Sequence, residues 1–249
     1  MCVKRVPMVG GRVVLTADGQ DVDTRLSGFT VSPHEECAVE EAVRLVEREG
    51  GRVTVLTLGP PEAAAQLRDM LALGARRAVL LETDGREWGP IATAAAIAEV
   101  AAATPFDLLL FGHEAADTGD GQVGVRVAHL LGLPAVTGIK ELERTGGGLR
   151  ASREYRGTRE AYDVALPAVV TVKEGINLPR YPSLPGRLRA KRAQIEVVAP
   201  QWRAEGLRKD GLRLPAESRR RAQILGQGVD AVPALVDLLA ELGLLGARP

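Results

Sequence analysis

The order of apolar segments and helical patterns in the first half of the chain limits the folds that it can adopt. Val53–Leu58, Ala78–Leu81 and Asp107–Phe111 are short apolar runs, separated by stretches with helical periodicity. Strands that are covered on both faces of a sheet have such near-continuous apolar sequences. Repeated strand–helix units build a parallel sheet with right-handed crossovers. The sequence therefore predicts an α/β fold with a doubly wound, mostly parallel sheet.

Four helices are expected beside these strands. The first begins after Ser32, which fits an N-cap position, and Glu35 completes the spacing of a capping box. Its apolar positions predict a buried face, and they place four charged residues outside that face: Glu40, Glu41, Arg44 and Glu47. The other three helices are expected over residues 62–73, 90–103 and 122–131.

The pattern changes after Pro134. Gly146–Gly148 predicts a hairpin turn, and Leu149–Tyr162 predicts an antiparallel arm. Leu166–Val172 and Ala193–Val198 predict two further strands. The chain then becomes polar before four leucines at helical spacing predict a last helix: Leu235, Leu238, Leu239 and Leu242. We expect a Rossmann-like nucleotide-binding domain over residues 1–200 and a C-terminal extension over residues 201–249.

Charge and composition argue against several classes of protein. Lys and Arg number 32, as do Asp and Glu, so no net field attracts nucleic acid or an anionic membrane. Aromatic residues make up only 3%, which leaves few side chains to stack on bases. Cys2 and Cys37 form no CxxC pair, and no spacing is typical of a metal site. With no long apolar segment, we expect no membrane insertion and a cytoplasmic location.

The glycine-rich segment Phe111–Gly124 follows a strand and leads into a helix. Ligands bind at the carboxyl ends of parallel strands, and the bare amides of a helix N-terminus bind phosphate. Gly119, Gly121 and Gly124 allow the backbone to approach an anion, while Asp117 and Thr118 can bond a ribose or an amide. The segment is neither GxGxxG nor a Walker A motif. On pattern alone, a plain turn capped by aspartates is an equal alternative to a phosphate site.

A catalytic pair of carboxylates is the third possibility for this segment. Asp117 and Asp120 lie close in sequence, but His113 is the single histidine near them. We therefore expect no acid–base or metal chemistry here, and we interpret the histidines as surface or helix residues.

The segment Leu166–Arg192 runs from a predicted strand through a proline-rich loop into a basic, helical stretch. Leu184 and Tyr181 are apolar residues beside a basic cluster: Arg180, Arg187, Arg189, Lys191 and Arg192. A solvated basic face is the ordinary alternative, and a nucleic-acid surface needs more breadth and more aromatics. We favour a docking surface in which apolar anchors bind a partner protein and the arginines steer its acidic groups.

Four segments in order resemble the electron transfer flavoprotein β-subunit family: Val3–Pro7, Cys37–Leu45, Asp117–Gly124 and Pro167–Lys191. The resemblance covers residues 2–200, with a weaker match in the final helix. It implies an electron-carrier subunit, not an enzyme, in a heterodimer whose α-subunit holds the redox-active FAD. The β-subunit binds AMP structurally. The implied partners are acyl-CoA and related dehydrogenases of fatty acid β-oxidation, and electron transfer flavoprotein–quinone oxidoreductase, which passes electrons to the quinone pool.

The resemblance also implies functional residues by position. The AMP site would use the backbone of Cys2, then Ser32, Leu58 and the loop residues Asp117, Thr118, Gly119, Asp120, Gly121, Gln122, Val123 and Gly124. Leu184 matches a leucine that enters a pocket on partner dehydrogenases, and its expected companions are Tyr181, Pro185, Arg187, Arg189 and Lys191. Glu154 matches an acid that holds the mobile FAD domain through an α-subunit arginine. We expect the tail over residues 201–249 to pack on the α-subunit, with its own domain as the alternative surface.

The chain departs from the family pattern in three places. The family's central first strand is almost missing here, Met8 replaces a common aspartate, and Thr118–Gly121 matches neither of the known loop types. One loop type belongs to electron-bifurcating members, in which a second FAD replaces AMP and NADH is the donor. The small residues here leave room for either ligand. A bifurcating subunit and a stand-alone α/β nucleotide-binding protein are therefore the alternatives, and the missing Walker motif argues against nucleotide hydrolysis.

Overall fold

The computed structural model describes residues 1–8, 13–204, 209–215 and 223–245. The chain divides into two units, Met1–Leu212 and Arg213–Pro249. The second unit contains helix α6, Val232–Glu241, which follows a 3₁₀ turn at Gly228–Ala231. The predicted last helix is therefore confirmed. None of the helices in the described ranges is long and apolar enough to cross a membrane.

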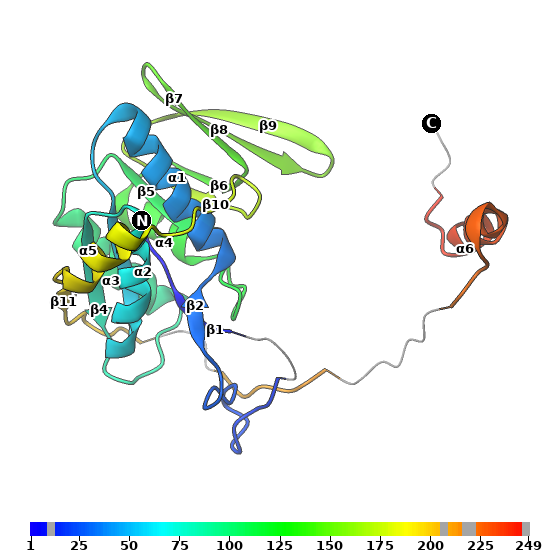
Figure 1. Ribbon diagram of the computed structural model, residues 1–249, viewed down its shortest axis with the longest axis horizontal. Coiled ribbons are helices and arrows are strands. Elements are labelled where there is room, and N and C mark those ends of the chain that lie inside the picture. The colour runs from blue at the N-terminus through cyan, green and yellow to red at the C-terminus, as the bar shows by residue number, and fades with distance from the viewer. Residues whose placement is uncertain (9–12, 205–208, 216–222, 246–249) are drawn as a thin grey trace. The chain divides into compact units, whose positions relative to one another are not determined.

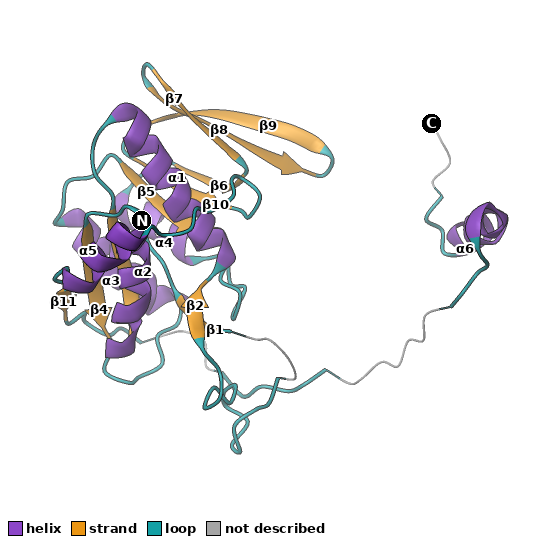
Figure 2. Ribbon diagram, in the orientation of Figure 1, coloured by secondary structure: helices purple, strands orange, loops and turns teal. Residues whose placement is uncertain are grey.

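Two parallel sheets form the centre of the first unit (Figures 1 and 2). One has the order β11–β4–β3, formed by Glu196–Val198, Arg77–Glu82 and Thr54–Gly59. The other has the order β5–β10–β6, formed by Leu108–Gly112, Ala168–Val172 and Ala135–Ile139. Five of these strands match the apolar runs in the sequence. Strand β6 was not predicted, because alanine, threonine and glycine interrupt its apolar pattern.

The first three residues of the chain join the two sheets. The N–H of Val3 donates to the carbonyl of Leu56 in β3, and the N–H of Leu56 donates to Met1, at 2.9 and 2.8 Å. On the other side, the N–H of Cys2 donates to the carbonyl of Leu110 in β5 at 2.9 Å. The segment Met1–Val3 therefore occupies the place of the central strand, although it is only three residues long. Figure 1 shows the N-terminus among the helices of this unit.

Helices cover both faces of this joined sheet, as the doubly wound prediction requires. One hydrophobic core contains residues of α1, Pro33–Glu49, and of α2, Ala64–Leu73, and the other contains residues of α3, Pro90–Ala102, and of α4, Val123–Leu131. Successive residues of a strand point to opposite faces. Leu80 and Leu81 of β4 accordingly belong to different cores. Helix α5, Leu184–Arg192, packs against α2 and confirms that the basic segment is helical.

The predicted antiparallel arm is also confirmed. Strands β7, Glu141–Thr145, β8, Gly148–Tyr155, and β9, Thr158–Ala165, form an antiparallel sheet at the top of the view in Figure 1. Gly146 and Gly147 connect β7 to β8, as the sequence predicts. A smaller antiparallel ribbon pairs β1, Arg5–Pro7, with β2, Phe29–Val31.

Helix α1 differs from its prediction in two respects. Ser32 occupies the N-cap position, but its side chain makes no cap hydrogen bond, so the capping prediction for its hydroxyl is wrong. Glu40 and Glu41 were expected outside the buried face, yet they are only 1% and 6% exposed. A segment far along the chain accounts for both burials, because Asn177 and Arg180 hydrogen-bond these carboxylates.

Candidate functional site

The carboxyl ends of the central strands meet at the point where the order of the sheet reverses. From Met1–Val3 the chain builds outward through β3 and β4 on one side and through β5 on the other. In open α/β sheets such a switch point is where ligands bind. The candidate site is therefore formed by the residues that follow the N-terminal segment and β5, and by the nearby starts of α1 and α4.

Lys4 connects the N-terminal segment to the glycine-rich loop. Its Nζ lies 2.8 Å from Oδ1 of Asp117 and 3.3 Å from Oγ1 of Thr118. The same Asp117 oxygen accepts the N–H of Thr118 at 2.8 Å. Lys4 therefore ties the N-terminal segment to the loop for which the sequence left a phosphate site and a plain turn as alternatives. Lys4 was not among the site residues predicted from the sequence, although it follows the apolar pair Cys2–Val3.

Glu35 in the first turn of α1 is a buried acid at the same place. Its carboxylate accepts the backbone N–H of Lys4. A Cβ atom on Gly112 would lie 2.4 Å from Cγ of Glu35, so only glycine at the end of β5 leaves room for this side chain. Burial raises the pKa of Glu35 to about 8, and the hydrogen bond from Lys4 opposes this rise. The capping-box spacing predicted only a capping role for this residue.

The start of α4 carries no side-chain cap. Gln122 occupies the N-cap position but provides no side-chain cap, because its amide oxygen accepts from Arg126 at 3.1 and 2.8 Å. The next residue, Val123, begins the helix. Gly119 and Gly121 have φ values of 64° and 61°, a backbone conformation that favours glycine.

Gly124 has a packing role that the sequence did not indicate. A Cβ atom there would lie 2.8 Å from Cγ2 of Thr171 and 3.3 Å from the ring of Phe111. Its missing side chain therefore lets α4 lie close to the strands of the sheet. Asp120, another of the predicted loop residues, is exposed.

Three more predicted site residues lie in or beside the central strands. The hydroxyl of Ser32 accepts the N–H of Ala116 at 3.1 Å, which ties the start of α1 to the glycine-rich loop. The N–H of Cys2 is engaged by the carbonyl of Leu110. Leu58 is the second-last residue of β3 and is half-buried.

His113 differs from the prediction that the histidines lie on the surface or in helices. It directly follows β5, and its Nδ1 lies 3.0 Å from Oγ1 of Thr171, which also accepts the N–H of Gly138 at 2.9 Å. The hydroxyl of Thr171 therefore links the ring of His113 to the backbone of Gly138. Burial, with the nearby charge of Lys173, lowers the pKa of His113. The ring is held as a neutral polar group at the edge of the site.

The predicted docking residues gather at the start of α5. Tyr181 and Leu184 are 94% and 72% exposed, and Leu184 is the first residue of the helix. The hydroxyl of Ser183 caps the helix by accepting the N–H of Gly186 at 3.2 Å. A Cβ atom on Gly186 would lie 2.5 Å from the carbonyl oxygen of Ala72, so α5 is packed tightly on α2. A rigid helix therefore presents the exposed leucine.

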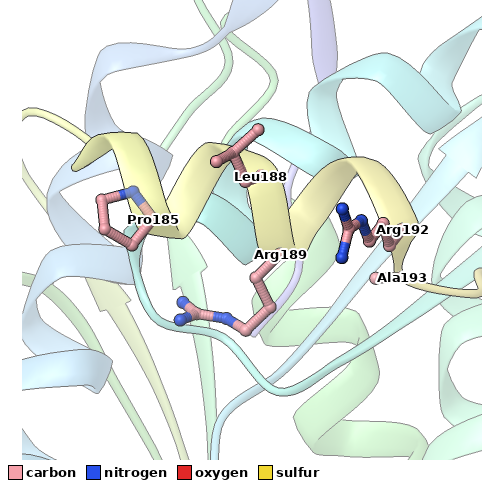
Figure 3. Close-up of a pocket in the computed structure, with 5 residues that line it drawn as sticks. All are labelled: Pro185, Leu188, Arg189, Arg192 and Ala193. Carbon is pink, nitrogen blue, oxygen red and sulfur yellow. The ribbon is translucent and has the colours of Figure 1, made fainter.

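The outer side of α5 carries a shallow groove. Its lining consists of Pro185, Leu188, Arg189, Arg192 and Ala193. Figure 3 shows the side chain of Arg189 below the middle of the helix and that of Arg192 at its end, beside Ala193. Arg187 and Lys191 are also exposed. Arg180 differs from these basic residues, because it is paired with Glu40 and Glu47.

Glu154, the predicted interdomain acid, lies on β8. Its side chain is 74% exposed, and its ion pair with Lys140 is long at 3.5 Å. Surface pairs of this kind contribute little to stability. The carboxylate can therefore take a stronger cationic partner.

Comparisons with known proteins agree on one family. The sequence model of the electron transfer flavoprotein domain matches residues 22–201. The electron transfer flavoprotein subunit beta of Bacillus subtilis (strain 168) is 40% identical over 172 residues, which are 68% of this chain and 67% of that protein. The subunit beta of Syntrophomonas wolfei is 35% identical over 200 residues, or 80% and 78% of the two chains. The Homo sapiens subunit beta is 34% identical over 204 residues, or 80% of each chain.

Proposed function

This chain belongs to the electron transfer flavoprotein β-subunit family, and from that premise we propose how it works within an electron carrier. As an electron-transfer component, it pairs with an α-subunit in a heterodimer. We infer that it binds AMP as a structural ligand, completes the site of the α-subunit's FAD, and docks partner dehydrogenases. Electrons then pass from acyl-CoA and related dehydrogenases to the flavin. From the flavin they pass to electron transfer flavoprotein–quinone oxidoreductase and the quinone pool.

One observation carries the AMP assignment. At the switch point of the sheet, Lys4 bonds Asp117 and Thr118 of the loop that leads to α4, and the start of α4 has no side-chain cap. A helix N-terminus attracts one phosphate group, and one lysine supplies the matching charge. The buried Glu35 nearby supplies no positive charge for a second phosphate, because a carboxyl group is either neutral or negative. The residues fit a mononucleotide better than the pyrophosphate of a second FAD.

Contacts with the α-subunit account for features that nucleotide binding does not use. Glu154 is exposed on β8 and suits an arginine of the mobile FAD domain. The helix α6 has leucines at helical spacing, and in its own unit no second helix is described for them to pack on. We infer that the C-terminal unit binds the α-subunit, so that both features serve assembly and flavin positioning.

Partner docking rests on Leu184 and Tyr181. Both side chains are strongly exposed. They lie at or just before the start of α5, which carries exposed arginines. An apolar anchor within a charged rim favours fast and salt-sensitive encounters with acidic partners. Such encounters suit a carrier that must leave each partner after one electron transfer.

The test is reconstitution with the α-subunit. The two subunits are co-expressed, the complex is isolated, and flavin absorbance is followed while an acyl-CoA dehydrogenase and its substrate are added. The proposal expects a stable heterodimer whose FAD is reduced only when the dehydrogenase is present. Direct reduction by NADH, without the dehydrogenase, would instead favour the electron-bifurcating alternative. Failure to form a flavin-containing complex would leave a stand-alone nucleotide-binding protein.

A further inference from the structure

The segment that presents the docking residues has no secondary structure of its own. Between the end of β10 and the start of α5, residues 173–183 form turns and irregular chain. Two exposed apolar side chains project from this segment, Leu178 at 84% and Tyr181 at 94% exposure. An irregular segment with exposed apolar groups needs other contacts to hold one conformation. Those contacts come from helix α1.

Hydrogen bonds with α1 hold the first half of this segment through the side chain of Asn177 and the backbone of Leu178. The side-chain amide of Asn177 donates to the carbonyl of Cys37 at 3.0 Å and to the carboxylate of Glu41 at 3.1 Å. Nη2 of Arg44 donates to the carbonyl of Leu178 at 3.0 Å. The segment is therefore fixed to α1 immediately before its exposed leucine.

Arg180 fixes the second half through a buried acid. Its backbone N–H and its Nε both donate to Oε2 of Glu40, at 3.2 and 2.9 Å, and its Nη2 donates to Oε1 at 3.2 Å. The same guanidinium bonds both carboxylate oxygens of Glu47, at 2.6 and 2.8 Å. Arg44 also bonds Glu40. The buried carboxylate of Glu40 thus accepts hydrogen bonds from both the side chain and the backbone of Arg180.

The charge state of this cluster favours order. Burial alone would raise the pKa of Glu40, but the hydrogen bonds from Arg180 and Arg44 outweigh burial, and the pKa is lowered. The acid is therefore ionised at neutral pH. Bidentate pairs between arginine and a carboxylate fix geometry as well as charge. Because Arg180 points inward to α1, the residues beside it in the sequence, Pro179 and Tyr181, are constrained with it.

We propose that Glu40 and Arg180 are positioning residues for partner docking. They hold the segment 177–181 in the conformation that offers Leu178 and Tyr181 beside Leu184. This inference rests on the proposed docking function and adds a requirement to it, namely that the surface be preorganised by α1. A loop that adopts its binding conformation only part of the time loses affinity in proportion to that fraction. Breaking the pair therefore raises KM for the partner and leaves the electron-transfer step itself unchanged.

The test uses the complete heterodimer and an acyl-CoA dehydrogenase. Glu40→Gln and Arg180→Gln are expected to raise the dehydrogenase's KM for the heterodimer by about tenfold, with kcat changed by less than about twofold. Hydrogen exchange of the amides in residues 177–181 should become faster in both variants. Arg180→Lys should raise KM less than Arg180→Gln does, since lysine keeps the positive charge but loses the bidentate geometry.

Matched variants test the positioning role of Glu40 and Arg180 separately from the docking function. Glu47→Gln removes the 53% exposed partner of Arg180 and should raise KM less than Glu40→Gln, while Glu99→Gln on α3 removes an exposed acid and should change nothing. If Leu184→Ala leaves KM unchanged, the docking function itself is wrong. If Leu184→Ala raises KM but Glu40→Gln and Arg180→Gln do not, only the positioning role is overturned. Should Glu40→Gln fail to fold, Arg180→Gln decides alone, because Glu40 then keeps Arg44.

Discussion

Replacing Leu184 by alanine is expected to weaken partner docking without weakening the fold. The side chain is 72% exposed, so its truncation removes little buried surface and should change the free energy of unfolding by less than about 0.5 kcal/mol. When a partner covers it, each buried CH₂ contributes about 0.8 kcal/mol, and the change to alanine removes about three carbons. The loss is therefore about 2 kcal/mol. That energy corresponds to a decrease of about thirtyfold in kcat/KM.

The assay measures reduction of the heterodimer's flavin by an acyl-CoA dehydrogenase at several heterodimer concentrations. Leu188→Ala is a suitable control, because Leu188 is 53% exposed on the same helix and lines the groove beside Arg189. We expect it to have a smaller effect. The reasoning would be refuted if Leu184→Ala lowered the melting temperature or dissociated the subunits, or if it left kcat/KM unchanged.

Three further predictions concern the site and its surroundings. Because burial raises the pKa of Glu35 from 4.5 to about 8, the folded state binds more protons than the unfolded state between these values. The free energy of unfolding should therefore fall as pH rises across this window, and Glu35→Gln should flatten that dependence in denaturant titrations; an unchanged slope contradicts the assignment. Gly124→Ala should lower the free energy of unfolding by about 1–3 kcal/mol, since its Cβ would lie 2.8 Å from Thr171, whereas Gly146→Ala has open space around it and serves as the control. Equal stabilities of the two variants would disprove tight packing at α4. Raising ionic strength from about 0.01 to 0.15 M shortens the Debye length from about 30 to 8 Å and should slow reduction by the dehydrogenase, less steeply in Arg187→Gln; a rate independent of salt would remove steering from the mechanism.

The fold class could be predicted from the sequence because the strands of the central sheet are buried on both faces. Continuous apolar runs such as Val53–Leu58 require cover on both sides, and the helical patterns between them supply it. The two cores on opposite faces of the sheet confirm this argument. Strand β6, Ala135–Ile139, was not predicted because it is held in the sheet by its pairing with β10. The local sequence pattern does not indicate that pairing.

The candidate site was predictable in outline but not in its charges. The loop after β5 is recognisable from its glycines, and the helix that follows is recognisable from its periodicity. Lys4 became a site residue only through contacts with Asp117 and Thr118, more than a hundred positions away. Glu40 was placed outside the buried face of α1 for the same reason, since its partner Arg180 is 140 positions distant. Local periodicity cannot report such long-range pairs.

The most direct test of the account is to identify the small molecules bound to the purified heterodimer. The complex is denatured, and the released ligands are identified and quantified by mass spectrometry. The account predicts AMP and FAD in equal amounts, and it predicts that Lys4→Met lowers AMP content while FAD is retained. Two FAD molecules per heterodimer without AMP would contradict the assignment of a mononucleotide to the site beside Lys4 and α4.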